Sequence, residues 1–330
     1  MNRNIVSGCP GCLALCCLAV AWCSTVSAAD RGDSSPVPAA DVAVSARTST
    51  IGVVPAEAQQ TDADRKLAGL VKLFESGIEA LSLKDYPAAH QALLLAAEQG
   101  YAKAQSALAG MYLRGQSVAV NDGEAVKWYR KAAEQGDAEG QTGLGLMYAQ
   151  GRGVEQSDAI AANWLRQAAE QGDAYAQSNL GVMFLEGRGV DSDESSAAEW
   201  FRLAALQGEL AAQNNLAAAF RDARGVEQDL VEAAWWFRQA ADKGSPDAQA
   251  SLGLMFHLGQ GVHQDDIEAV QWFRQAAEQG NAIAQYYLGI SYSEGLGLEQ
   301  DVAAAGEWLE KAAQQGLIAA QEYLRSGQAQ

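Results

Sequence analysis

Residues Asp137–Gly172 read DAEGQTGLGLMYAQGRGVEQSDAIAANWLRQAAEQG, and this 36-residue stretch decides the fold. The same pattern occurs six times, from residue 101 to residue 316, without an insertion or a deletion. The period is easiest to follow in its closing glycine, at Gly136, Gly172, Gly208, Gly244, Gly280 and Gly316. It is equally clear in its tryptophan, at Trp128, Trp164, Trp200, Trp236, Trp272 and Trp308. A fixed period of this length predicts a solenoid, in which each unit buries its apolar face only against its neighbours.

The second half of each unit predicts a helix with one apolar face. Apolar residues recur there at helical spacing, as in Ala161, Trp164, Leu165, Ala168 and Ala169. A polar residue at the start of this helix is expected to be its N-cap in every unit: Asn121, Ser157, Asp193, Asp229, Asp265 and Asp301. A glutamate three residues further on predicts a capping box in three units: Glu124, Glu232 and Glu268.

The first half of each unit predicts another helix, which ends at a glycine. Its apolar face is represented by Ala176, Leu180 and Met183. The loop after it, such as Gly187-Arg188-Gly189-Val190, predicts a positive φ that ends the helix. Two units depart from this pattern, which leaves the local packing of their first helices open. The departures are Ala109 and Ser117 in the first unit, and Ala217-Ala218-Ala219-Phe220 and Ala223 in the fourth.

Shorter helical segments flank the repeats. Residues 63–100 predict a hairpin of two helices, Ala63–Leu83 and Ala88–Gln99, that resembles a tetratricopeptide repeat and would cap the array. Residues 317–330 include Ala319–Arg325, which repeats the start of a first helix and is expected to cover the last full unit. The predicted fold class is therefore all-α.

The first 62 residues predict export, followed by a linker. Arg3, the apolar stretch from Leu13 to Trp22 and the small residues Val26-Ser27-Ala28-Ala29 are typical of a signal peptide over residues 1–28. Cleavage is expected after Ala28 or Ala29, and an uncleaved anchor is the lesser alternative because a spanning helix needs about 20 apolar residues. All five cysteines lie in this segment, so the mature chain would contain none. Residues 29–62 are rich in Ala, Ser, Pro, Val and Thr and predict a flexible linker.

The charge balance excludes some partners. The chain has 23 Lys and Arg residues against 41 Asp and Glu residues, a net charge of −18. A surface this acidic disfavours nucleic acid and anionic lipid as partners. The mature chain is also predicted to have no membrane span.

No catalytic, cofactor-binding or metal-binding constellation stands out, so none is predicted. The three histidines, His90, His257 and His263, do not have the spacing of zinc ligands. The Gly-x-Gly loops lack the third glycine and the preceding strand of a phosphate-binding loop, and no Gly-x-Ser-x-Gly motif occurs. The chain is therefore not predicted to be an enzyme.

Columns that are identical in every unit are better explained by packing than by recognition. Glutamine recurs in register at Gln105, Gln141, Gln177, Gln213, Gln249, Gln285 and Gln321. A binding residue would rarely be needed seven times, so we predict a recurring hydrogen bond between neighbouring helices. The same reasoning places the tryptophan column in the core.

These motifs carry a resemblance over Tyr101–Gly316. Ala-x-x-x-Leu-Gly-x-Met-Tyr, then Gly-x-Gly-Val, then Ala-x-x-Trp-x-x-x-Ala-Ala-x-x-Gly is similar to the Sel-one-like repeat, a relative of the tetratricopeptide repeat. The resemblance implies a right-handed α/α superhelix in which the first helices line a concave groove. It also implies adaptor or regulatory work at a bacterial cell envelope.

Three columns of the first helix vary from unit to unit and are expected to face that groove. The first column holds Lys103, Glu139, Tyr175, Ala211, Asp247 and Ile283. The second holds Ser106, Thr142, Ser178, Asn214, Ala250 and Tyr286. The third holds Gly110, Leu146, Val182, Ala218, Leu254 and Ile290.

From these columns we predict a partner-binding groove with an apolar, aromatic C-terminal end. Its residues are Tyr175, Asn214, Leu254, Ile283, Tyr286, Tyr287 and Ile290. Tyrosines are favoured at interfaces because they bury a large area at low entropic cost. The alternative is that some of these side chains only pack against the adjacent first helix.

The sequence thus predicts a periplasmic or secreted, non-enzymatic scaffold that binds one or more proteins in its groove. One alternative is an exported hydrolase of cell-wall or β-lactam substrates, as reported for some relatives, but those relatives are rich in cysteine. Another is a secreted factor that engages host proteins, for which Arg31-Gly32-Asp33 is the one local motif.

Overall fold

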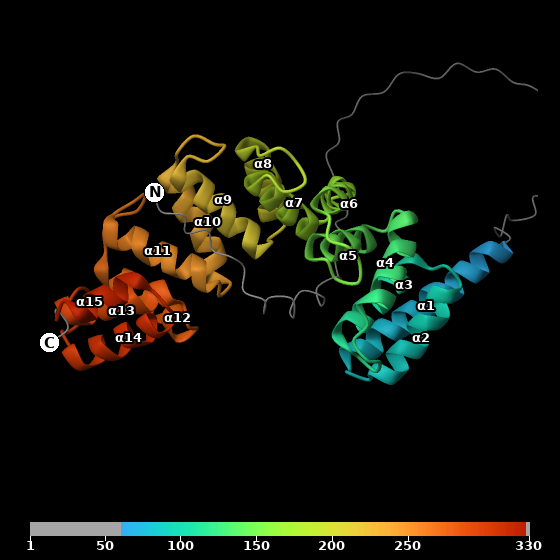
Figure 1. Cartoon of the computed structure of the whole chain (residues 1–330), viewed down its shortest axis with the longest axis horizontal. Helices are drawn as coiled ribbons and strands as arrows, with labels where there is room; N and C mark the ends of the chain where they lie inside the picture. The colour runs from blue at the N-terminus through green and yellow to red at the C-terminus, as the bar shows by residue number, and fades with distance from the viewer. Residues whose placement is uncertain (1–60, 328–330) are drawn as a thin grey trace, which may run out of the picture.

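The computed structural model describes residues 61–327, and within that range the chain forms fifteen α-helices and no strand (Figure 1). The N-terminal hairpin consists of α1 (Asp62–Ser82) and α2 (Tyr86–Glu98). The first helices of the six repeats are α3 (Ala102–Arg114), α5 (Ala138–Gln150), α7 (Ala174–Glu186), α9 (Leu210–Asp222), α11 (Pro246–Leu258) and α13 (Ala282–Glu294). The second helices are α4 (Asp122–Glu134), α6 (Asp158–Glu170), α8 (Glu194–Leu206), α10 (Leu230–Asp242), α12 (Asp266–Glu278) and α14 (Val302–Gln314). The last helix is α15 (Ile318–Arg325).

The described part of the chain contains no helix that is both long and apolar enough to cross a membrane. The predicted signal peptide lies outside the described residues, as does the predicted linker up to residue 60. The helix predicted to begin at Ala63 begins one residue earlier, because Thr61 and Asp64 form a reciprocal capping box at its start.

The helices form a curved array in which each one packs against the next (Figure 1). Among the described helices, the clearest contacts between alternate helices are those of α3 with α5 and of α11 with α13, both pairs of first helices. Second helices make at most marginal contact with one another. The side of a curved stack on which the elements approach most closely is its inner side, so the contacts in these two pairs place the first helices on the concave surface there.

Every second helix begins at the predicted cap. The predicted capping boxes are only half formed. The side chains of Asn121, Asp229 and Asp265 accept a hydrogen bond from the backbone N–H of the glutamate three residues on. Yet the reciprocal bond of a capping box is not formed, since the N–H of Asp229 already donates to the carbonyl of Phe220. The glutamate is therefore free for other partners, and Glu232 accepts a bond from the indole N–H of Trp236 at 3.0 Å.

The core is centred one residue after each tryptophan. Phe201, Phe237 and Phe273 are among the largest side chains that are almost completely buried. The tryptophans differ among themselves: Trp128 and Trp236 are buried, whereas the other four are only half-buried. The prediction that the whole tryptophan column lies in the core is thus right for two units, and in the others the indole covers the edge of the core.

The loop glycines have two different structural roles. The first one ends the first helix with a positive φ, for example 66° at Gly187. Ala223 takes the same conformation with a φ of 57°, so α9 ends where the other first helices end despite its departure in sequence. The second glycine lies against the preceding unit: a Cβ on Gly189 would overlap the backbone carbonyl of Asp158. No side chain can be added there without moving the backbone.

Candidate functional site

The glutamine column joins successive units, as the sequence predicts. Each side-chain amide donates to a backbone carbonyl eight residues earlier in the preceding helix; Gln177 reaches Ala169 at 3.0 Å. The amide oxygen of Gln177 in turn accepts a bond from Gln207 at 2.9 Å. The column is buried in all six repeats, so it holds the stack together and is not available to a partner. The seven bonds are those of Gln105, Gln141, Gln177, Gln213, Gln249, Gln285 and Gln321.

The first variable column is the exposed surface of the first helices. All six of its residues are exposed, including Tyr175 at 39% and Ile283 at 45%. Charged and neutral side chains follow one another along it, from Lys103 and Glu139 near the N-terminal end to Ile283 near the other. The six units therefore present six different side chains on an otherwise repeated frame.

The second variable column mostly lies between adjacent first helices. Ser106, Thr142, Ser178 and Ala250 are buried, and the Ser106 hydroxyl donates to Asp137, the cap of the next first helix, at 2.6 Å. Asn214 is half-buried, and its Oδ1 is buried without a hydrogen-bond partner among the described residues. The alternative that this column packs instead of binding applies to most of its members.

The predicted aromatic end of the groove divides into core and surface. Tyr287 stacks on Phe273 of α12, with ring centroids 5.3 Å apart and an angle of 14° between the planes, so it belongs largely to the core. Tyr286 packs edge-on against Tyr287 and is half-buried, and burial raises the pKa of its hydroxyl. Leu254 and Ile290 are also half-buried. Of the predicted site residues, Tyr175 and Ile283 are the two most exposed, and even they are less than half open to solvent.

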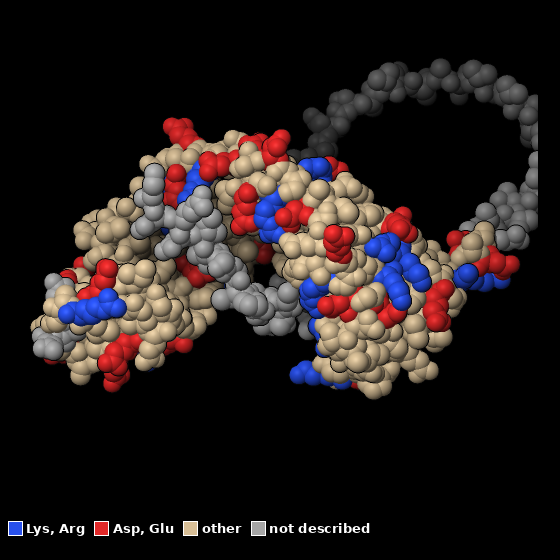
Figure 2. Space-filling view, viewed as in Figure 1, with Lys and Arg blue, Asp and Glu red and all other residues tan. Residues whose placement is uncertain are grey.

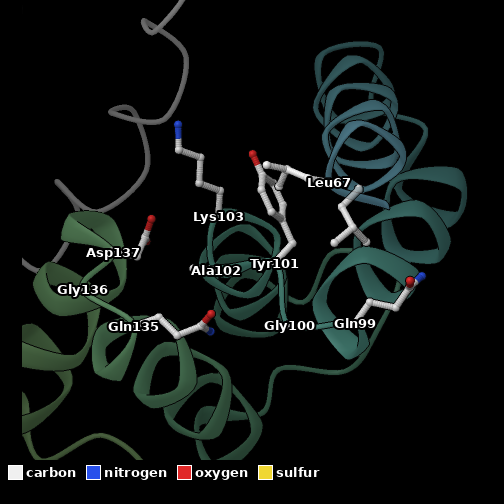
Figure 3. A pocket seen from close by; sticks show the side chains of 10 residues that line it. Leu67, Gln99, Gly100, Tyr101, Ala102, Lys103, Gln135, Gly136 and Asp137 are labelled. Carbon is white, nitrogen blue, oxygen red and sulfur yellow. The ribbon is translucent and has the colours of Figure 1, made fainter. Parts of the chain in front are cut away.

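An open pocket, which the sequence did not point to, lies at the N-terminal end of the first-helix surface. Its volume is about 430 Å³, and its walls include Leu67 of α1, Tyr101 and Lys103 at the start of α3, and Asp137 at the start of α5 (Figure 3). Tyr101 and Lys103 extend side by side from the start of α3, and the aliphatic Leu67 faces them from α1 (Figure 3). The Tyr101 ring packs edge-on against the Phe74 ring, with ring centroids 5.5 Å apart. No motif marked this pocket, because it forms where the non-repeating hairpin meets the first repeat.

Carboxylates crowd together beside this pocket. The pKa of the Glu139 carboxyl is raised above 4.5, first because the surrounding protein removes part of its hydration and then because Asp137 and Asp173 repel its charge. Arg114 and Lys103 offset part of this effect. Burial likewise raises the pKa of Asp173. Glu139 is nevertheless exposed, so solvent screening weakens these effects.

We expect Glu139→Gln to raise the melting temperature at pH 7. A carboxyl whose pKa is higher in the folded state loses stability as the pH rises through that value, because the folded state must then hold an unfavourable charge. The advantage of the variant should shrink as the pH falls and disappear well below the ordinary carboxyl pKa of 4.5, where Glu139 is protonated in both the folded and the unfolded state. Thermal melts at several pH values measure this, with Glu155→Gln on an exposed loop as the control. A gain that does not depend on pH would contradict the electrostatic explanation.

The three histidines lie in different surroundings and are not brought together. No group of three potential metal ligands occurs among residues 61–327. His257 pairs with Asp266 at 2.7 Å and so links α11 to α12, whereas His263 is exposed. His90 is half-buried and lies edge-on to Tyr112.

Basic side chains are unevenly distributed along the array. Six of the eight lysines lie between residues 66 and 131, and only Lys243 and Lys311 follow. Figure 2 shows the basic side chains concentrated over the N-terminal helices, with carboxylates spread over the whole visible face. The central and C-terminal surface therefore has a stronger excess of negative charge.

The repeats match a known family. The model of the Sel1 repeat matches residues 102–137, 138–173, 174–209, 210–245, 246–281 and 282–317, and the chain belongs to the Sel1-repeat family. Solenoids of this family typically serve as protein-interaction scaffolds and are typically non-catalytic. A search of curated proteins finds no match.

Two solved structures share both fold and sequence with this chain. One is c5321, described as a protective antigen of uropathogenic Escherichia coli with an SLR fold; it is 36% identical with a TM-score of 0.69. That alignment covers 79% of this chain and 57% of c5321, so the chain spans little more than half of that relative. The other is a Sel1 repeat protein from Oxalobacter formigenes, 33% identical with a TM-score of 0.67, over 73% of this chain and 96% of that one.

Proposed function

We propose that this protein is an exported, non-enzymatic scaffold that holds a protein partner against the concave surface of its first helices. One observation carries the proposal: the first variable column is exposed in all six units and differs in every one, while the other two variable columns are buried or half-buried. The columns that repeat in every unit maintain the fold, and the side chains that differ in the first variable column supply specificity for a partner. Tyr175 and Ile283 are the apolar anchors that this surface offers.

The export part of the proposal rests on the signal-like residues 1–28. It assigns the protein to the periplasm or to the exterior of the cell, with a partner in envelope regulation or assembly. Mass determination of the protein recovered from the periplasm or the medium should give a chain that begins at Ala29 or Asp30. A chain that keeps the first 28 residues would refute the export proposal while leaving the scaffold proposal intact.

We expect the double variant Tyr175→Asp, Ile283→Asp to lose its partner while it keeps its helicity and melting temperature. Each truncated anchor can reduce the binding free energy by about 2 kcal/mol, and a buried carboxylate at the interface adds to the loss. Co-purification from an envelope extract, quantified against the wild type, measures the effect. Glu155→Ala, on an exposed loop between helices, is the control and should retain the partner. Equal capture by the double variant would move the partner away from this surface.

A further inference from the structure

The outward faces of the second helices carry a second surface that the concave site does not include. Four columns of these helices face away from the first helices and are exposed or half-exposed in every unit. One of these columns is polar in most units: it holds Lys127 in α4, Asn163 in α6 and Glu307 in α14. The same position in α10 holds Trp235, which is 49% exposed. Its ring packs edge-on against Trp236, with ring centroids 4.5 Å apart, yet about half of the indole stays exposed in a column that is otherwise polar.

Trp235 is not isolated. In the same four columns, α8 contributes Leu203 and Leu206, 46% and 69% exposed, where other units have Lys, Gln, Glu or Asp. Val231 of α10 and Ile267 of α12 are 68% and 61% exposed, where other units have Gly, Ala or Ser. We call Leu203, Leu206, Val231, Trp235 and Ile267 the outer patch. All of it comes from three consecutive second helices in the middle of the array.

Each pair of neighbouring helices in this set is linked at one end, although the helices themselves make little direct contact. At their C-terminal ends, the Lys243 ammonium after α10 donates to the Gly208 carbonyl after α8 at 3.2 Å. At their N-terminal ends, Gly261 in the loop before α12 lies against the Leu230 carbonyl at the start of α10. Leu203 and Leu206 are therefore on the helix next to Val231 and Trp235, and Ile267 is on the helix beyond.

Within the four outward columns of α8, α10 and α12, all of the charged side chains are carboxylates. The outward columns of α8, α10 and α12 hold the exposed carboxylates Glu199, Asp242 and Glu278 and no lysine or arginine. The adjacent column of the same helices holds arginines, and each has a partner. Arg202 lies over the Phe220 ring, Arg238 pairs with Glu268 at 3.2 Å, and Arg274 donates to the Tyr292 hydroxyl at 3.3 Å. Lys243 binds the carbonyl described above. In the flanking repeats the same columns hold Lys127, Lys131 and Lys311, so lysine is compatible with these positions.

We propose that the outer patch docks a basic amphipathic helix of a partner protein, with an apolar stripe on the patch and flanking lysines or arginines on the carboxylates. Apolar area supplies affinity in such contacts, and complementary charge supplies specificity and a faster association. A second copy of this chain is a poorer occupant. Pairing two outer patches would bring like carboxylates together on chains of net charge −18. This surface is distinct from the concave one and does not depend on it.

The test uses a synthetic helical peptide with a leucine stripe flanked by lysines, and a matched peptide in which glutamates replace the lysines. Fluorescence anisotropy should show that the protein binds the lysine peptide and not the glutamate peptide. Trp235→Glu with Leu206→Glu should weaken binding by about tenfold or more. Other units already have glutamate at both columns, so this variant should melt as the wild type does. It also adds negative charge, so nonspecific attraction would strengthen binding instead of weakening it.

Ile283→Asp on the concave surface is the matched control and should bind the lysine peptide normally, which separates this inference from the proposed function. Failure of the wild type to bind the lysine peptide would overturn the inference. So would equal or tighter binding by the double variant. Light scattering that shows a dimer abolished by Trp235→Glu would also overturn it, in favour of a second copy of the chain.

Discussion

Replacing Phe201 with alanine should lower the free energy of unfolding by about 3–5 kcal/mol, the range for deleting a large buried aromatic side chain. Phe201 is 2% exposed and packs in a core shared with Leu216 of α9 and Phe237 of α10. Its ring also fits against Gly181, where a Cβ would approach it to 2.7 Å. Because adjacent units are coupled in a solenoid, the loss should spread to neighbouring repeats and broaden the transition. Chemical denaturation followed by circular dichroism measures both effects.

The neighbouring tryptophan is the matched comparison. Trp200 is half-buried at the edge of the core, so Trp200→Ala should destabilise less than Phe201→Ala, although tryptophan is the larger residue. A larger loss of stability in Trp200→Ala than in Phe201→Ala would show that the tryptophan column is the centre of the hydrophobic core in each unit, as the repeat predicts.

Replacing Gly189 with alanine should cost about 2–5 kcal/mol. An L-residue with a positive φ costs about 1–2 kcal/mol, and Gly189 has a φ of 70°. The new Cβ would also overlap the Asp158 carbonyl at the start of α6, and forcing an added group into a packed site typically costs about 1–3 kcal/mol. Thermal or chemical unfolding measures the sum.

Gly187→Ala separates the two costs. Gly187 has a φ of 66°, but a Cβ there would meet only the Ser192 side chain, at 3.3 Å. This variant should therefore lose about 1–2 kcal/mol, the conformational cost alone, and Ala223 shows that alanine can occupy the same position in the fourth unit. Equal losses at positions 187 and 189 would mean that the loop does not press on the preceding repeat.

The repeated columns made most of the fold predictable. The period predicts the number of units, and the cap residues predict where the second helices begin. Seven glutamines in register predict a recurring hydrogen bond between neighbouring helices, which Gln177 and its counterparts form with a backbone carbonyl of the preceding helix. Each of these features is local or recurs at a constant offset, so one chain contains several independent copies of the same signal. The residue one place after each tryptophan was missed as the core centre, because it varies among Tyr, Leu and Phe.

The candidate site was less predictable, because helical spacing alone does not say how closely neighbouring helices approach. The second variable column seemed as suited to recognition as the first, yet Ser106 and Thr142 are buried between first helices. Tyr287 was predicted to be a binding residue of the groove, but its ring stacks on Phe273 and belongs largely to the core. The pocket at Tyr101 was not predictable either, because it lies at the one junction where the repeat pattern begins.

The loop arginines illustrate the same limit. Arg152 and Arg188 lie in the loops that follow the first helices of their units, outside the variable columns. In the structure each forms an ion pair with the preceding repeat, Arg152 with Asp122 at 2.7 Å and Arg188 with Asp158 at 2.8 Å. Their replacement would change the coupling between units, so the exposed Glu155 is the better control.

Site-specific photo-crosslinking in the living cell tests the central claim most directly. A photoreactive amino acid is placed at Ile283 on the first-helix surface and, in a separate variant, at Glu155 on the exposed loop. Our account predicts a discrete crosslinked partner from position 283 and none from position 155. A partner captured from position 155 and not from position 283 would contradict it and would assign recognition to the loop edge of the solenoid.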